Sequence, residues 1–192
     1  MTINTLFATR FYDAALGDDA LVAELADACR DLAEQDRAGR NWSKEHGYRG
    51  YTSYASLDDL PIRDPRFGDL VKLLDKHVAA FARDCGFELA KKLKLDSLWV
   101  NVLKPGGTHS GHIHPHSVVS GTLYILVPPG SGALRLEDPR LPLMMAAPSR
   151  PDTFVYVEPG EGRVLLWESW LRHEVMPNAA NHDRISISFN YR

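Results

Sequence analysis

The chain has 192 residues, which fits one domain with a sizeable core and leaves little room for a second. Its hydrophobic content of 44% and charged content of 24% are typical of a globular protein in water. A formal net charge of −3 gives no broad basic surface, so nucleic acid is not expected as a partner. No segment is apolar enough to span a bilayer or to act as a secretion signal, which predicts a cytoplasmic protein.

The first half of the chain is predicted to be helical. One helix should begin after Asp18 or Asp19 and end at Gly39, and a second should follow Pro65 and end near Gly86. Both place apolar residues at helical spacing, with the two cysteines among them as buried filling. Their apolar positions are Leu21, Leu25, Cys29 and Leu32 in the first helix, and Leu70, Leu74, Val78, Phe81 and Cys85 in the second. The stretch Asn41–Asp64 between them is expected to be an ordered loop or irregular strand.

From Ser97 onward, short apolar or alternating runs separated by turn residues predict seven or eight strands. They are Leu98–Leu103, Gly111–His114, Val118–Val127, Ala133–Leu136, Thr153–Val157, Arg163–Trp167, His173–Met176 and Arg184–Tyr191. The apolar connection Asp138–Pro151 is expected to be either a packed flap or a lid. A helical N-terminal region followed by these strands predicts a mainly β fold of the jelly-roll type. Residues 1–192 should form one domain, with 1–96 as a helical support region and 97–192 as the β core.

Four of the eight histidines lie in one short segment, at positions 109, 112, 114 and 116. Because side chains alternate faces along a strand, His112 and His114 should point into the same cavity and offer two adjacent metal ligands. Pro115 should end the regular pairing, which makes His116 a weaker candidate, and His109 is expected in the preceding turn. The alternative is a histidine-rich surface loop without ligand function.

A third ligand must come from elsewhere in the chain, and His173 is the best candidate. It lies at the start of a predicted strand between apolar neighbours. Together with the pair at His112 and His114 it would complete a facial three-residue site.

The last predicted strand alternates strictly between polar and apolar residues. Its polar positions are Arg184, Ser186, Ser188 and Asn190, and its apolar ones are Ile185, Ile187, Phe189 and Tyr191. This strand could simply have its polar face in water. If that face instead lines the interior, Arg184 and Ser186 would clamp the distal carboxylate of a dicarboxylic acid, and Tyr124 could add a phenolic hydrogen bond.

These motifs resemble the iron(II)/2-oxoglutarate dioxygenase superfamily, in which His-x-Asp/Glu, a distal histidine and an Arg-x-Ser motif follow in this order. The matching elements here are His112-Ile113-His114, His173 and Arg184-Ile185-Ser186. More narrowly, the chain is similar to a bacterial and phage group of 2-oxoglutarate oxygenases. The stretches that carry this likeness include Trp99–Val102, His112–Pro115, Ser120–Tyr124, Leu136–Arg140 and Arg184–Asn190, with Leu6–Thr9 near the start.

The resemblance implies a double-stranded β-helix, cupin-like, with Fe(II) as cofactor and 2-oxoglutarate as co-substrate. It also implies that a small-molecule or peptide substrate is hydroxylated by molecular oxygen, with release of succinate and CO2. Asn101 is expected to line the wall of the co-substrate pocket.

One residue departs from the superfamily pattern, because His114 stands where those enzymes have a carboxylate. A three-histidine site occurs in cupin-type enzymes that use no 2-oxoglutarate, which keeps such an enzyme as an alternative. The other alternative is a non-catalytic metal-binding β-barrel. A substitute carboxylate from Glu137, Asp138, Glu168 or Glu174 is not expected, and a homodimer is possible.

Overall fold

The computed structural model describes residues 2–4, 6–140 and 153–192. From residue 141 onward, the flap or lid predicted at Asp138–Pro151 lies outside the described residues. In chain order the elements are β1 (Phe11–Ala15), α1 (Asp19–Gln35), α2 (Arg37–Glu45), β2 (Gly50–Thr52), α3 (Leu60–Arg63), α4 (Pro65–Asp84), β3 (Leu95–Leu103), β4 (His109–His112), β5 (Val119–Leu126), β6 (Leu134–Glu137), β7 (Phe154–Val157), β8 (Arg163–Glu168), β9 (His173–Val175) and β10 (Arg184–Tyr191).

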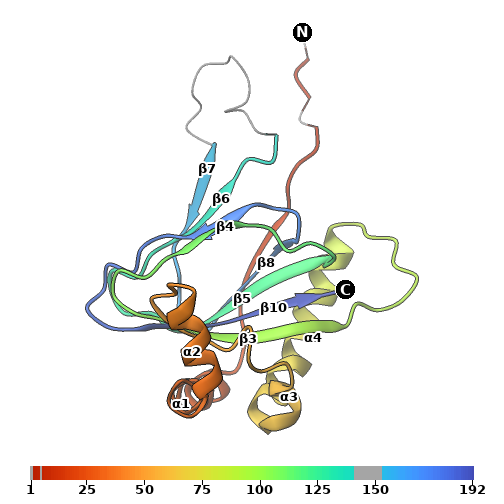
Figure 1. The fold of residues 1–192 in the computed structure, drawn as a ribbon. Helices are drawn as coiled ribbons and strands as arrows, with labels where there is room; N and C mark the ends of the chain where they lie inside the picture. Colours follow the sequence, from red (N-terminus) through yellow and green to blue (C-terminus); the bar gives the residue numbers. More distant parts are fainter. Residues whose placement is uncertain (1, 5, 141–152) are drawn as a thin grey trace.

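The described strands form two antiparallel sheets. The large sheet has the order β1-β8-β5-β10-β3-β2 and the small sheet has the order β4-β9-β6-β7. From β3 to β10 the chain passes back and forth between the two sheets, staying in the small one only from β6 to β7. Figure 1 shows the small sheet over one face of the large sheet and the helices on the other side. The protein is therefore mainly β, with helices in its first half, as predicted.

The helices bury the outer face of the large sheet. Apolar residues of α1 and α4 pack in one cluster with alternate residues of β3, β5, β8 and β10. On β10 the residues of this cluster are Ile185, Ile187, Phe189 and Tyr191. Because side chains alternate along a strand, the polar residues of β10 must face the space between the two sheets. The polar face therefore lines the interior, as the carboxylate-clamp interpretation requires, and the alternative of a face in water is excluded.

A second, smaller apolar cluster fills part of the space between the sheets. It joins inner residues of the large sheet, such as Tyr124 and Trp167, to Leu134 and Leu136 of the small sheet. The polar inner face of β10 lies beside this cluster. Together they line a cavity between the two sheets, where a binding site can form.

The predicted first helix is wrong at its C-terminus. The helix ends at Gln35, and Asp36 accepts a hydrogen bond from the Gly39 backbone N–H and so begins a second helix, α2. Gly39, taken as a stop signal, lies within the first turns of α2, where its small size allows contact with Tyr51 and Ser56. The second predicted helix is confirmed as α4, which follows an Asp64 cap and has Pro65 in its first turn.

Two strands occur in the region 1–96 where a helical support was expected. β1 pairs with β8 at one edge of the large sheet, and β2 pairs with β3 at the other. Both are short: β2 has three residues, and β1 has an irregular pattern of exposure that gives little period-two signal. The strand predicted at Gly111–His114 is shifted, since β4 covers His109–His112.

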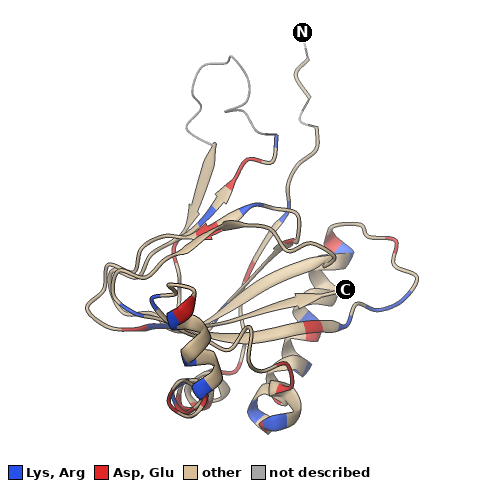
Figure 2. Cartoon of the chain, viewed as in Figure 1, with Lys and Arg blue, Asp and Glu red and all other residues tan. Residues whose placement is uncertain are grey.

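Charged residues are distributed over the helices with both signs mixed, whereas β5 carries none (Figure 2). Among the described helices, none has the length and apolar character needed to cross a membrane.

Candidate metal centre

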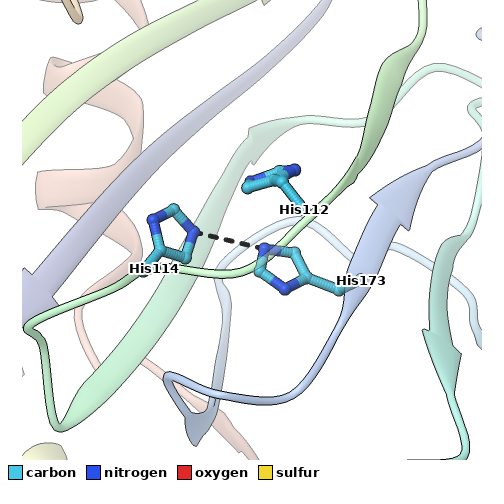
Figure 3. A group of neighbouring side chains, drawn as sticks. All are labelled: His112, His114 and His173. Atoms are coloured by element: carbon cyan, nitrogen blue, oxygen red, sulfur yellow. Dashed lines mark hydrogen bonds between the residues drawn. The ribbon is translucent and has the colours of Figure 1, made fainter.

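Two elements of the small sheet bring the three predicted ligands together. His112 is the last residue of β4 and His173 is the first residue of β9, and the two are directly paired across these strands. His114 lies two residues beyond β4, where its backbone N–H donates to the Ser169 carbonyl. Figure 3 shows the three rings turned toward one another.

The spacing of the three imidazoles suits a single ion. One ligand nitrogen from each ring can be chosen so that all three lie within 4.8 Å of one another. The Nε2 atoms of His114 and His173 are 3.3 Å apart, the contact drawn in Figure 3. The ring centres of His112 and His173 are 4.4 Å apart. Among the described residues, this group is the one cluster of His, Cys, Asp or Glu with such geometry, and it contains no carboxylate.

Backbone carbonyls orient two of the rings for ligation. The Nδ1 atom of His112 lies 2.7 Å from the Ser110 carbonyl, and that of His173 lies 2.8 Å from the Leu171 carbonyl. A carbonyl can only accept, so Nδ1 carries the proton in each ring and Nε2 keeps its lone pair. This is the tautomer that a metal ligand of the Nε2 type requires.

Burial keeps two of the imidazoles neutral at physiological pH. Desolvation is the main cause that lowers the pKa of His173 to about 3 and that of His114 to about 4, and the nearby His112 lowers both further. Neutral imidazole is the form that binds a metal, so these side chains bind an ion without first releasing a proton.

The strand argument used for His112 and His114 is only partly right. His114 is outside β4, so strand alternation does not explain its orientation, although the ring does reach the cluster. His114 is held instead by its surroundings: its ring centre is 5.8 Å from that of Trp99, and its Nδ1 is 3.5 Å from Nδ2 of Asn190.

Arg184 lies in the same cavity, at the start of β10. It is 3% exposed, and its Nη1 donates to the Gly132 carbonyl at 3.0 Å. Its Nε has no hydrogen-bond partner, and no ion pair to a carboxylate is found for it among the described residues. Its guanidinium lies 5.6 Å from the ring centre of Tyr124. A buried cation without a counter-charge is costly, so this position favours an anionic ligand.

The other predicted co-substrate residues line this cavity together with the three histidines and Arg184. Tyr124 and Ser186 are buried at its wall. Asn101 also lines it, but its amide is already used inside the protein: it accepts from Thr52 at 2.9 Å and donates to Ser188 at 3.1 Å. Asn101 is therefore better placed to fix the wall than to bind a ligand directly.

Two residues of this cavity were missed from the sequence. His109 was expected in a turn, but it begins β4 and its ring lies 4.7 Å from that of His112. Tyr48 comes from the loop after α2, and its hydroxyl points toward Asn101 at 3.5 Å. Burial raises the pKa of Tyr48 to about 12 despite the opposing effect of Arg184. The register of β4 is irregular between His109 and His112, so strand alternation could not have signalled that both rings line one cavity, and no local signal marks Tyr48.

The other histidines and carboxylates behave as expected. His116 is exposed and has a φ of +71°, which fits a turn. None of Glu137, Asp138, Glu168 and Glu174 belongs to the histidine group. Glu137 pairs instead with Arg172 and Glu174 with Arg135.

Residues 97–190, which are 94 of the 192 residues, match the sequence model of a family described as "Putative 2OG-Fe(II) oxygenase". This segment contains the three histidines and Arg184. No curated protein is a significant match to the sequence.

Solved structures share the fold over nearly the whole chain. EvdO2 from Micromonospora carbonacea var. aurantiaca has a TM-score of 0.72 at 14% identity, covering 99% of this chain and 92% of that one. A Pseudomonas putida prolyl-4-hydroxylase has a TM-score of 0.61 at 20% identity, covering 96% and 88%. HygX from Streptomyces hygroscopicus, with nickel and 2-oxoglutarate bound, has a TM-score of 0.62 at 18% identity, covering 95% and 82%.

The donor set fits a transition metal that leaves coordination positions open. Three neutral imidazoles suit iron(II), and equally zinc, copper or nickel. The family match agrees with the iron- and 2-oxoglutarate-dependent oxygenase class that the sequence predicts.

Proposed function

We propose that this protein is an iron(II)- and 2-oxoglutarate-dependent oxygenase that hydroxylates a small-molecule or peptide substrate. The proposal rests on the family match over the β core and on the convergence of three imidazoles beside a buried guanidinium. At identities below 25%, the structural neighbours support the fold only, and their ligands are guides for the choice of experiment.

The observation that carries the co-substrate assignment is the unpaired Arg184. A buried arginine without an ion pair among the described residues calls for an anionic group in the cavity. The carboxylate of a dicarboxylic acid would accept from the free Nε of Arg184 and remove the cost of burying it. A non-catalytic barrel gives no reason for this arginine, and the family match favours a 2-oxoglutarate co-substrate over a three-histidine cupin that uses none.

In this proposal each side chain has a defined part. His112, His114 and His173 hold iron(II) through one nitrogen each, and the Ser110 and Leu171 carbonyls fix the orientation of two of these rings. Iron(II) bound there would let molecular oxygen act as the oxidant of two groups at once: one oxygen atom would go to the substrate C–H bond, and the other to 2-oxoglutarate, which is oxidised to succinate and CO2.

On the co-substrate side, Arg184 binds the distal carboxylate of 2-oxoglutarate. Ser186 and Tyr124 offer hydroxyl donors beside it, as the sequence predicts. Tyr124 and Trp167 exclude water from this end of the cavity. Asn101 fixes the wall of this cavity through its hydrogen bonds to Thr52 and Ser188.

The test is an anaerobic titration of the purified protein with iron(II) and 2-oxoglutarate. Chelation of the oxo acid by the iron should give a weak metal-to-ligand charge-transfer absorption band. Arg184→Ala should weaken 2-oxoglutarate binding by about 100-fold, since a desolvated charged partner is removed. Iron binding without 2-oxoglutarate should be unchanged in this variant.

Arg30→Ala is the matched control, because Arg30 is an exposed arginine paired with Asp27 on α1. It should leave both the band and the affinity unaltered. A wild-type protein that binds iron(II) but gives no band at saturating 2-oxoglutarate would favour the cupin alternative. A wild-type protein that binds no metal would contradict both enzymatic assignments.

The detailed fold belongs to the same proposal. Strands β3 to β10 form two four-stranded layers, and the chain passes back and forth between them. β1 and β2 are added at the two edges of one layer. This strand order is the one expected of a double-stranded β-helix, or jelly roll. We infer that residues 1–192 form one domain in which this β-helix is the catalytic core.

We also propose that the protein is cytoplasmic, that it forms a homodimer, that nucleic acid is not its partner, and that it belongs to the bacterial and phage group of 2-oxoglutarate oxygenases. Succinate release across a panel of candidate substrates would address the substrate directly.

A further inference from the structure

A second, open cavity adjoins the histidine cluster on the side away from Arg184. It shares Tyr48, Trp99, His109, His112 and His114 with the inner cavity but contains neither Arg184 nor Tyr124. The histidines therefore form the partition between the two cavities. If the proposed function holds, a substrate in this outer cavity would lie next to the metal without entering the co-substrate site.

Three large aromatic side chains form a row along the wall of the outer cavity. Trp42 of α2 lies 6.5 Å from Tyr54, and Tyr54 lies 5.2 Å from Trp99, measured between ring centres. Trp99 in turn lies 5.8 Å from His114, one of the rings in Figure 3. This aromatic row thus leads from the surface to the metal centre.

Tyr54 is the member of the aromatic row that is available to a ligand, whereas Trp99 is only 5% exposed. Tyr54 is 60% exposed although it is a large aromatic residue at the edge of a concave surface. One side of Trp42 is covered by the stacked ring of His46, at 4.2 Å. Large exposed aromatic groups around a cavity are typical of binding sites rather than of a bare surface.

The charges around the outer cavity are balanced within the protein. Its described lining contains no lysine or arginine. The one carboxylate, Asp96, is paired with Arg192 at 2.7 Å. The remaining polar groups are the imidazoles of the histidine cluster, hydroxyls and an amide, among them Ser97, Ser117 and Asn190. This differs from the inner cavity, where Arg184 has no counter-charge among the residues that the structure describes.

We propose that the outer cavity binds an uncharged, saturated ring of the substrate, packed against the exposed ring of Tyr54 in the aromatic row, with its polar edge toward the hydroxyl groups. The C–H groups of such a ring gain contact with aromatic faces, and no charge has to be desolvated without a partner. A sugar ring and a prolyl ring both have this chemistry. A carboxylate, phosphate or ammonium group beside Tyr54 would find no unpaired lysine, arginine, aspartate or glutamate in the described lining of this cavity.

The test uses protein loaded with zinc(II) and 2-oxoglutarate, which cannot turn over, and observes small probes by saturation-transfer NMR. Methyl glucoside, glucosamine and glucuronate present the same ring in neutral, cationic and anionic form. N-acetylprolinamide represents the prolyl ring. At least one neutral probe should give transfer at least about fivefold stronger than both charged sugars, and the neutral probe that responds distinguishes a sugar from a prolyl group.

Variants assign the signal to the aromatic row. Tyr54→Ala should abolish transfer to the neutral probe, and Tyr54→Phe should retain it, since the ring and not the hydroxyl makes the contact. Trp170→Ala is the control, because Trp170 is 46% exposed and does not line the outer cavity.

The inference is overturned if no neutral probe binds, if a charged sugar binds as well as the neutral one, or if transfer survives in a folded Tyr54→Ala protein. These outcomes leave the proposed function intact when 2-oxoglutarate still binds to the zinc protein. Loss of 2-oxoglutarate binding in the wild type would instead contradict the proposed function, and ring binding could still be measured without it.

Discussion

Arg184 shows how one side chain can be unfavourable for folding and favourable for binding. It is buried against Tyr124, makes one hydrogen bond to a carbonyl, and has an unpaired Nε. Burial lowers the pKa of its guanidinium, although Tyr124 and Tyr48 oppose this, which reflects the cost of keeping a charge there. Such a residue is retained when a ligand supplies the missing charge.

Replacing Arg184 by methionine should therefore separate stability from ligand binding. Arg184→Met removes the desolvated charge and keeps an apolar stem, so the ligand-free protein should be as stable as wild type or more stable by about 1 kcal/mol. With metal present, 2-oxoglutarate at 100 times the wild-type Kd should raise the unfolding free energy of wild type by about 3 kcal/mol, and that of the variant by less than about 0.5 kcal/mol. Thermal unfolding with and without 2-oxoglutarate measures both effects. A ligand-free variant several kcal/mol less stable than wild type would contradict this view of Arg184.

His114 decides whether the site tolerates the carboxylate that the superfamily pattern has at this position. His114→Ala should weaken zinc binding by about 100-fold, because one of three ligands is lost. His114→Asp should recover part of that loss, since a carboxylate oxygen is also a metal ligand. Titration of the metal-free proteins with zinc against a competing chelator provides the two dissociation constants. Wild-type affinity in His114→Ala would show that His114 is not a ligand.

At the residue scale, the sequence predicted which side chains come together better than it predicted the reasons for their placement. His112, His114, His173 and Arg184 do share one region of the molecule. However, His114 is fixed by Asn190 and Trp99 rather than by strand alternation. Tyr48 could not be predicted as a cavity residue from the sequence, because only tertiary packing brings the loop after α2 to the cavity.

At the scale of elements, Asp36 organises the first helices. Its carboxylate accepts from the Gly39 N–H at 3.0 Å, the Tyr51 hydroxyl at 3.0 Å and the Ser56 hydroxyl at 2.5 Å. Burial raises the pKa of this carboxyl, but the hydrogen bonds, from Ser56 first, outweigh burial and the pKa is lowered overall. Asp36 thus ends α1, begins α2 and ties both to the segment that follows.

Asp36→Ala should lower the free energy of unfolding by about 1–3 kcal/mol, because a helix cap is lost and the hydroxyl of buried Tyr51 loses its acceptor. Urea unfolding followed by circular dichroism measures this change. Asp31→Ala is the control: Asp31 is exposed within α1, so its loss should change stability by less than about 0.5 kcal/mol. Equal effects of the two substitutions would contradict this function of Asp36.

Element prediction succeeded where the periodic signal was long. The twenty residues of α4 and the eight of β10 repeat their apolar positions often enough to define helix and strand. It failed at β1 and β2, which are short edge strands stabilised by β8 and β3 rather than by their own pattern. It also failed at Asp36, since a capping residue within an otherwise helical stretch cannot be distinguished from an exposed one by spacing alone.

For the whole molecule, the histidine cluster predicts a sensitivity of the metal-free protein to acid. In the folded protein, burial is the main cause that lowers the pKa of three histidines. The pKa is about 4 for His109 and His114 and about 3 for His173. In the unfolded chain these side chains titrate near 6.5. As the pH falls from about 6.5 toward 4, the unfolded chain therefore binds protons that the folded chain does not, and stability decreases, by up to about 1.4 kcal/mol per pH unit for each such group.

Urea unfolding of the metal-free protein at pH 6.5, 5.5 and 4.5 would measure this slope. His109→Gln should make the slope smaller, because one of the depressed groups is removed without removing a proposed ligand. His182→Gln is the control, since His182 is exposed and should leave the slope unchanged. A slope that is the same in all three proteins would contradict the expected contribution of His109.

The two faces of β10 have a consequence for engineering the enzyme. Positions 185, 187, 189 and 191 anchor the helices, whereas 184, 186, 188 and 190 look into the space between the sheets. A mutational library restricted to 186 and 188 would therefore vary the wall of the inner cavity on the co-substrate side, while the packing of the helices on the sheet stays intact. A library on the odd-numbered positions would yield mostly misfolded clones and no new specificity.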